Sequence, residues 1–114
     1  MASSDEHKKA VEGFIAALSA HNIDEYISHY DPKCEVTLNG QVVIRSRDEL
    51  KKQMEQIISD PDYKVHIVEF LPIEGDDCVR FIVGDTDKNR KDETCVFSKE
   101  GKIVQQMITI LDKQ

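Results

Sequence analysis

Residues 34–44 have the sequence Cys34-Glu-Val-Thr-Leu-Asn-Gly-Gln-Val-Val-Ile44. In the first half, apolar side chains at 34, 36 and 38 alternate with Glu35 and Thr37, a pattern typical of a half-buried strand. Asn39-Gly40 follows, and both residue types tolerate the positive φ angles of a two-residue hairpin turn. We therefore predict a first strand at Cys34–Leu38, a tight turn, and a partner strand at Val42–Ile44.

Two helical segments precede this hairpin. The first is predicted at about 4–20, where apolar residues recur at helical spacing. The second is predicted from Asn22 to about Tyr30, and Asp31-Pro32 should end it because proline lacks a backbone donor and disfavours helix in the residue before it. The first helix has a capping box at Ser3 and Glu6, and the second at Asn22 and Glu25. The apolar stripe of the first helix consists of Val11, Phe14, Ile15 and Leu18.

A third helical segment is predicted after the hairpin, at about 47–59. Ser46 and Glu49 form a further capping box at its start. Asp60-Pro61-Asp62 should end it, for the same reason as the earlier proline. Its apolar stripe consists of Leu50, Met54, Ile57 and Ile58.

The rest of the chain is predicted to be strand. Turn signals separate four runs, and consecutive strands with short turns form an antiparallel meander. Val65–Val68 and Ile108–Leu111 are apolar on both faces, so one face can pack on the helices while the other needs a second cover. We therefore expect a homodimer that pairs through the open face of the sheet. The four runs are Tyr63–Leu71, Asp77–Gly84, Lys91–Ser98 and Lys102–Leu111.

The composition is that of one ordinary soluble domain, residues 1–114, with 39% hydrophobic and 32% charged residues. A net charge of −7 disfavours nucleic acid and anionic membranes, so neither is an expected partner. No apolar run reaches the roughly 20 residues of a membrane span, and the polar start lacks a secretory signal. Three cysteines without C-x-x-C spacing indicate reduced thiols and a cytoplasmic, reducing compartment: Cys34, Cys78 and Cys95.

The four histidines do not form a metal-binding pattern, because neither H-x-x-x-H nor H-x-H occurs. Glycines are scattered singly, so a phosphate-binding loop is also not predicted. We therefore expect no metal site and no cofactor. His7 and His29 are predicted to lie on exposed faces, His21 at the end of the first helix, and His66 in a strand.

The order of helices and strands, with several local patterns, resembles the nuclear transport factor 2-like superfamily over about residues 8–112. The patterns are Asn22-Ile-Asp-Glu-Tyr-Ile-Ser-His-Tyr30, the strand Cys34–Leu38, Arg47-Asp-Glu-Leu50 and Phe97-Ser-Lys-Glu-Gly-Lys-Ile103. That superfamily includes the ketosteroid isomerases, the SnoaL-type cyclases, scytalone dehydratase and the association domain of calmodulin-dependent kinase II. The resemblance implies an α+β cone-shaped roll, also called cystatin-like. In it, three N-terminal helices pack on a strongly curved, mainly antiparallel mixed sheet of about six strands.

The resemblance also places residues at the positions that isomerases use for catalysis. The first-helix tyrosine of the isomerases falls on Phe14, which has no hydroxyl to donate to an enolate oxygen. Their general base falls on Leu38, which cannot move a proton, and a third-helix tyrosine falls on Met54. Tyr30 matches a supporting tyrosine, and Glu93 falls where a second acid would be. Ketosteroid isomerase activity is therefore not expected.

Two candidate catalytic residues remain, and each has two interpretations. Glu93 shares strand parity with Cys95, which indicates an inward direction and a raised pKa. Its neighbours Lys91 and Asp92 instead suggest a hairpin end where the carboxylate reaches solvent. Tyr30 is either a core tyrosine with its hydroxyl at the rim or a ligand contact.

Three functions stay open. The first is a homodimeric module that binds a small apolar ligand in its cone without isomerase chemistry. The second is a protein-association or dimerisation module. The third is a SnoaL-like cyclase or a dehydratase-type enzyme in which Glu93 and Tyr30 donate protons. The predicted ligand-binding residues are Phe14, Leu18, Tyr30, Leu38, Met54, Cys95, Ile108 and Ile110.

Overall fold

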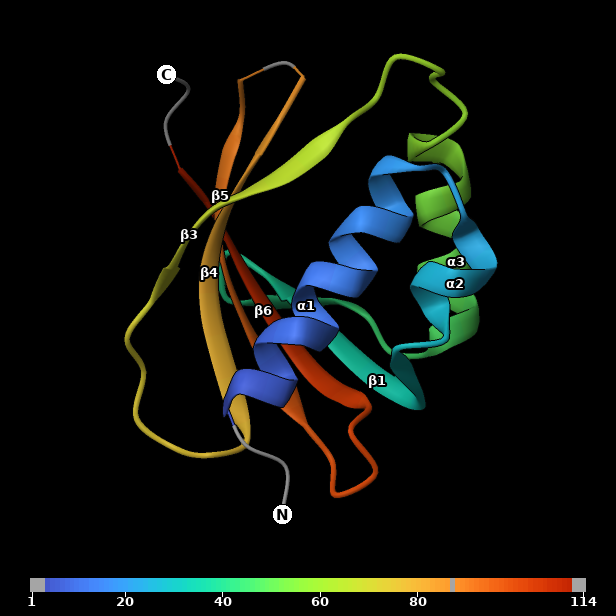
Figure 1. The fold of residues 1–114 in the computed structure, drawn as a ribbon. Coiled ribbons are helices and arrows are strands. Elements are labelled where there is room, and N and C mark those ends of the chain that lie inside the picture. The colour runs from blue at the N-terminus through green and yellow to red at the C-terminus, as the bar shows by residue number, and fades with distance from the viewer. Residues whose placement is uncertain (1–3, 87, 112–114) are drawn as a thin grey trace.

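The computed structural model describes residues 4–86 and 88–111, and its elements follow the predicted order. Three helices come early in the chain, and a β-hairpin lies between the second and the third (Figure 1). Four further strands complete the fold. The elements are α1 (Ser4–Ser19), α2 (Ile23–Ile27), β1 (Tyr30–Leu38), β2 (Gln41–Ile44), α3 (Arg47–Ile57), β3 (Val65–Leu71), β4 (Cys78–Asp85), β5 (Arg90–Phe97) and β6 (Ile103–Leu111).

The strands form one mixed sheet in the order β2-β1-β6-β5-β4-β3. The predicted meander is confirmed, because β3 to β6 pair antiparallel in succession. β1 joins β6 in parallel and brings the N-terminal hairpin to the other edge. The sheet curls, and the helices cover its concave face, with α1 lying across it (Figure 1). This arrangement is the predicted α+β cone.

The Asn39-Gly40 turn forms as predicted, with φ angles of 50° and 87°. Asn39 also ties the hairpin to β6, because its backbone N–H donates to the Ile108 carbonyl at 2.8 Å. Its side-chain oxygen accepts from the Ile110 N–H at 3.0 Å. The turn therefore closes the hairpin and holds it beside the strand that completes the concave face.

The second helix is shorter than predicted, and the prediction that Asp31-Pro32 ends it is wrong. α2 stops at Ile27, where Ser28 caps it by donating its hydroxyl to the Glu25 carbonyl at 2.6 Å. Tyr30 already belongs to β1 and pairs with Ile103. The proline is tolerated inside β1 because the register with β6 shifts between Tyr30 and Glu35, so no regular ladder bond is demanded there.

Two of the three predicted helix caps are confirmed. The Asn22 side chain accepts from the Glu25 N–H at 3.2 Å, and the Ser46 hydroxyl accepts from the Glu49 N–H at 3.2 Å. The carboxylate of Glu49 reaches back to the Arg45 N–H at 2.7 Å. The third capping box involves Ser3, which lies outside the described residues.

The core contains a histidine that the sequence placed on an exposed face. His7 is 2% exposed, and its ring stacks on Phe97 with centroids 4.2 Å apart. The prediction is wrong because the stripe of α1 that meets the sheet extends back to its first turn. His29 was also predicted to be exposed, but it is half-buried against Gly13 of α1. Cys34 and Cys95 are buried, Cys78 is half-buried, and all three are free thiols.

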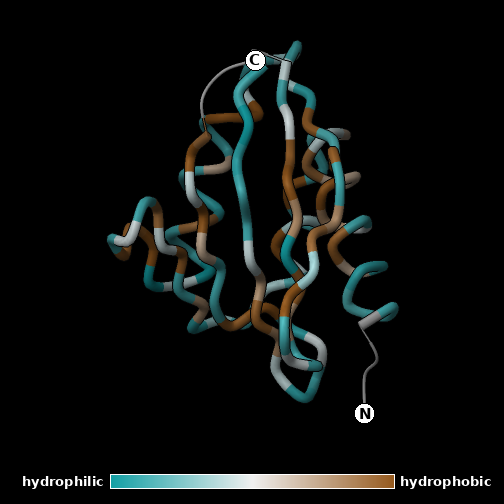
Figure 2. Tube along the Cα trace, turned by 90° about the vertical axis from the view of Figure 1, so that its left-hand side faces the viewer, coloured by the Kyte–Doolittle hydropathy of each residue, from teal (hydrophilic) through white to brown (hydrophobic). Residues whose placement is uncertain are grey.

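The opposite, convex face of the sheet carries polar and apolar residues together. Viewed from the sheet side, the strands change between polar and apolar colour in short segments (Figure 2). Such a trace colours the residues of both faces, because neighbouring side chains of a strand point to opposite faces. On the convex face itself, Arg80 and Asp92 lie beside Ile82. Within residues 4–86 and 88–111, no helix is long and apolar enough to cross a membrane.

Candidate functional site

The cone encloses a cavity of about 190 Å³ between the concave face of the sheet and the helices. Most of its wall is apolar, and the wall comes from every layer of the fold. Six of the eight predicted ligand-binding residues line it: Phe14, Leu18, Leu38, Met54, Ile108 and Ile110. Ile110 is the most exposed of these, at 49%, so it lies at the mouth.

The other two predicted ligand-binding residues do not line the cavity. Tyr30 and Cys95 are both fully buried in the core behind its wall. Burial raises the pKa of the Cys95 thiol well above its usual range, so the thiol stays protonated and poorly nucleophilic. For Tyr30 the prediction of a hydroxyl at the rim is wrong, because that hydroxyl is bonded inside the protein.

Glu93 is the acidic group of the cavity. It lies on β5, is 6% exposed and lines the cavity, so the interpretation that it reaches solvent is wrong. Strand alternation sends Glu93 inward and Asp92 outward, where Arg80 binds it at 3.0 and 2.5 Å. Loss of hydration raises the pKa of Glu93 to about 7, against the opposing effects of the Gln106 hydrogen bond and the Lys91 charge.

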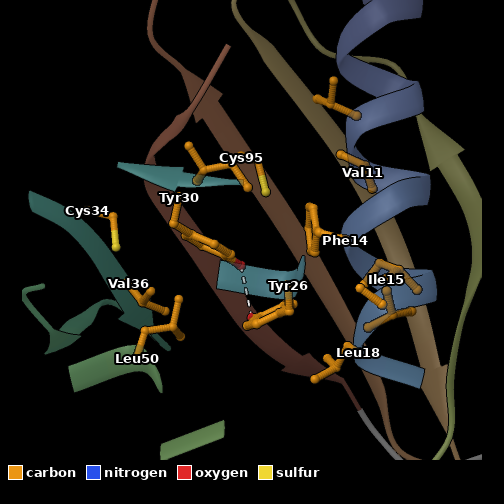
Figure 3. Packing of buried hydrophobic residues seen from close by; sticks show 14 of the residues in the cluster. Val11, Phe14, Ile15, Leu18, Tyr26, Tyr30, Cys34, Val36, Leu50 and Cys95 are labelled. Atoms are coloured by element: carbon orange, nitrogen blue, oxygen red, sulfur yellow. Dashed lines mark hydrogen bonds between the residues drawn. The ribbon is translucent and has the colours of Figure 1, made fainter. Parts of the chain in front are cut away.

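A hydrogen-bond chain connects Glu93 to two tyrosines. Tyr30 donates to Gln106 Oε1 at 2.6 Å, and Gln106 Nε2 donates to Glu93 Oε1 at 2.5 Å. Because Tyr30 donates its only hydroxyl proton to Gln106, it accepts in its 3.0 Å contact with Tyr26, and Tyr26 is the donor there. Figure 3 shows these two hydroxyl groups directed toward one another beside Phe14. Each hydrogen bond of this series, from Tyr26 through Tyr30 and Gln106, is therefore donated in the direction of Glu93.

This series of hydrogen bonds determines which oxygen of Glu93 is left to the cavity. Gln106 occupies Oε1, and Oε2 has no hydrogen-bond partner among the described residues. When Glu93 is protonated, its proton therefore sits on Oε2, available to a molecule in the cavity. Burial raises the pKa of Tyr26 and of Tyr30 well above the usual range, so both stay protonated and keep the chain directed.

Sequence reasoning missed seven polar residues of the cavity wall: Tyr26, Gln53, Tyr63, Asp85, Asn89, Lys91 and Gln106. Gln106 shares strand parity with Ile108 and Ile110, both predicted to line the cone, so extending that alternation by one step would have found it. Lys91 shares parity with Glu93 in the same way. Within the described ranges, no group of three or more His, Cys, Asp or Glu side chains is placed to hold a metal ion.

Comparison with known proteins identifies the fold. No family model matches the sequence, and no curated protein matches it. A SnoaL-like protein of unknown function from Burkholderia thailandensis superposes with a TM-score of 0.82 at 16% identity, covering 93% of this chain and 94% of that one. A nuclear transport factor 2-like protein of unknown function from Cytophaga hutchinsonii gives a TM-score of 0.72 at 14% identity, covering 92% and 89%.

An enzyme is among the similar structures as well. SalBIII is described as an epoxide hydrolase/cyclase-like enzyme with a role in pyran ring formation in the polyether salinomycin. It superposes with a TM-score of 0.81 at 10% identity, covering 97% of this chain and 95% of that one. At such low identity these likenesses establish the architecture alone, because one fold serves many functions.

Proposed function

Since the chain has the nuclear transport factor 2-like fold, we propose that its cone binds a small, mainly apolar molecule that carries one hydrogen-bond acceptor, such as a carbonyl oxygen. The observation that carries the proposal is Glu93, a buried carboxyl with one oxygen left to a mainly apolar cavity. Protonated Glu93 donates to the acceptor, and the apolar wall contacts the rest of the ligand. A cavity of about 190 Å³ suits a small metabolite, because pockets for drug-sized ligands start at about 300 Å³.

The first test uses acetophenone, a small apolar ketone, with binding followed by NMR titration of the backbone amides. We expect acetophenone to bind at pH 6 and to bind about tenfold more weakly at pH 8.5, because ionised Glu93 no longer donates a proton. Leu38→Trp should abolish binding by filling the cavity from β1. Leu38→Met keeps the volume and is the matched control. Equal binding by wild type and Leu38→Trp would refute the proposal.

A second candidate function is proton-transfer catalysis in the same cavity. Its specific support is that Glu93 has a pKa of about 7, which lets one group both give and take a proton near neutral pH. The likeness to SalBIII adds support at the level of the fold. Glu93→Gln keeps the shape of the side chain and removes the transferable proton. Unchanged turnover of an identified substrate by that variant would rule out this role.

We also propose that a second copy of the chain covers the convex face of the sheet. Half-buried apolar residues Val68, Ile82 and Val96 lie on that face, together with Met107, which is 40% exposed. The charges at its centre cancel within one chain, because Arg80 forms two hydrogen bonds with Asp92. A face whose central charges are already paired within one chain loses less by being buried against an identical face.

The dimer proposal predicts a native mass spectrum at twice the 13.0 kDa of one chain. Met107→Asp should shift the protein to monomer, because it would bury an unpaired carboxylate at the contact. Ile73→Asp is the control, since Ile73 is also 40% exposed but lies in the loop between β3 and β4. A wild-type protein that remains monomeric at micromolar concentration would contradict the proposal.

A further inference from the structure

The cavity has a cationic group at its mouth that the proposed function does not use. Lys91 lines the cavity, two residues along β5 from Glu93 and toward the β4–β5 turn. Its strand partners Val83 and Ile110 line the same cavity. Strand alternation therefore places Lys91 and Glu93 on the same face, and two residues of a strand span about 7 Å.

The acidic neighbours of Lys91 are engaged elsewhere. Asp85 also lies at the mouth, and its carboxylate accepts from the backbone N–H of Asn89 at 3.1 Å and from the Asn89 side chain at 3.4 Å. Asp92 is bound by Arg80 on the other face. Within the described parts of the chain, Lys91 forms no ion pair. Lys91 is half-buried and is the cationic side chain of the lining formed by the described residues, so an anion that enters the cavity would meet it.

The opposite end of the cavity disfavours an anion. Glu93 and Gln106 lie there within a mainly apolar wall, so a carboxylate beside them would lose its hydration, and it would also be repelled whenever Glu93 ionises. Lys91 acts over this distance, because its charge lowers the pKa of Glu93. An elongated ligand with one charged end thus has one favourable orientation, with the charged end at the mouth.

We propose that the ligand is a small organic acid whose carboxylate binds Lys91 at the mouth while a carbonyl or similar acceptor at the other end of the molecule meets Glu93 inside. This proposal rests on the proposed function, because it assigns the class of ligand for the same cavity. A single cation suits a monocarboxylate. The apolar wall between the two polar groups contacts the body of the molecule.

The test compares 4-acetylbenzoate with 4-acetylbenzamide, which has the same shape and no charge. At pH 6 we expect wild type to bind the acid about fivefold to tenfold more tightly than the amide, the effect of one partly shielded ion pair. Lys91→Gln should reduce this ratio to about one, and Lys91→Arg should retain it. Lys88→Gln is the matched control, because Lys88 is exposed in the same turn and does not line the cavity.

The outcomes separate the two proposals. If acid and amide bind wild type equally, or if Lys91→Gln keeps the preference for the acid, the assignment of an organic acid is overturned while the binding cavity stands. If neither compound binds and acetophenone does not bind either, the proposed function is refuted, and the assignment of an organic acid is refuted with it. Circular dichroism of each variant confirms that it is folded before the ratio is interpreted.

Discussion

Replacing Glu93 with glutamine is expected to make the protein more stable in mildly alkaline solution and to flatten its pH dependence. Between pH 4.5 and pH 8.5 the stability of Glu93→Gln should rise by about 3 kcal/mol relative to wild type, the equivalent of moving the pKa from 4.5 to about 7. Urea unfolding of both proteins across this range measures the difference.

The sign follows from which state holds the proton. Below pH 4.5 the Glu93 carboxyl is protonated in both the folded and the unfolded protein, so it does not change the free energy of unfolding with pH. As pH rises from 4.5 to about 7, the unfolded chain releases its proton while the folded protein keeps it, and the free energy of unfolding falls. Above about pH 7 both states are ionised and the loss levels off. A glutamine at position 93 has no proton to release, so the variant does not lose this part of the free energy of unfolding.

Glu69→Gln is the control for the loss of one negative charge. Glu69 lies on β3 and is exposed, so its substitution should leave the pH profile like that of wild type. Parallel profiles for wild type and Glu93→Gln would show that the Glu93 carboxyl is hydrated, and the donor role assigned to it would be lost. The Gln106 hydrogen bond survives in the variant, because a glutamine oxygen at 93 accepts from Nε2 as well.

The predictable parts of this fold are those determined by near neighbours in the chain. The Asn39-Gly40 turn needs only two residues with positive φ, and it forms as predicted. The cap at Ser46 requires one partner three residues away. By contrast, the end of α2 was misplaced because Tyr30 pairs with Ile103, a contact that depends on a strand far along the chain.

In the candidate site, too, local patterns predict some features, whereas others depend on contacts between distant parts of the chain. Alternation along β5 indicated that Glu93 points inward, but the charges beside it suggested solvent, and the sequence alone could not rank these two signals. The structure shows that Asp92 points outward and is bound by Arg80, whereas Lys91 shares the inward face with Glu93. The bond from Tyr30 to Gln106 joins residues 76 positions apart, so a local pattern could not reveal it.

Replacing Phe14 with alanine is expected to cost about 3–5 kcal/mol of unfolding free energy, the range for removing a fully buried phenylalanine ring. Phe14 is 1% exposed and lies where α1 meets the sheet. Its ring makes edge contacts with Tyr26, Tyr30 and Phe81 at centroid distances of 5.9, 5.8 and 6.2 Å. Alanine keeps the helix but loses these contacts and enlarges the cavity that Phe14 lines.

Phe70→Ala is the control that shows whether the cost is specific to the Phe14 ring or common to the loss of any aromatic ring. Phe70 is only half-buried on β3 and contacts Phe81 at 6.2 Å, so its removal should cost less than half as much in urea unfolding. Phe14→Leu should recover much of the loss, since it restores most of the apolar volume. A cost below about 1 kcal/mol for Phe14→Ala would mean that the ring does not hold α1 against the sheet. The cavity wall would then lack the rigid side that selective binding of a small ligand requires, because an interior that collapses or opens freely does not keep one shape.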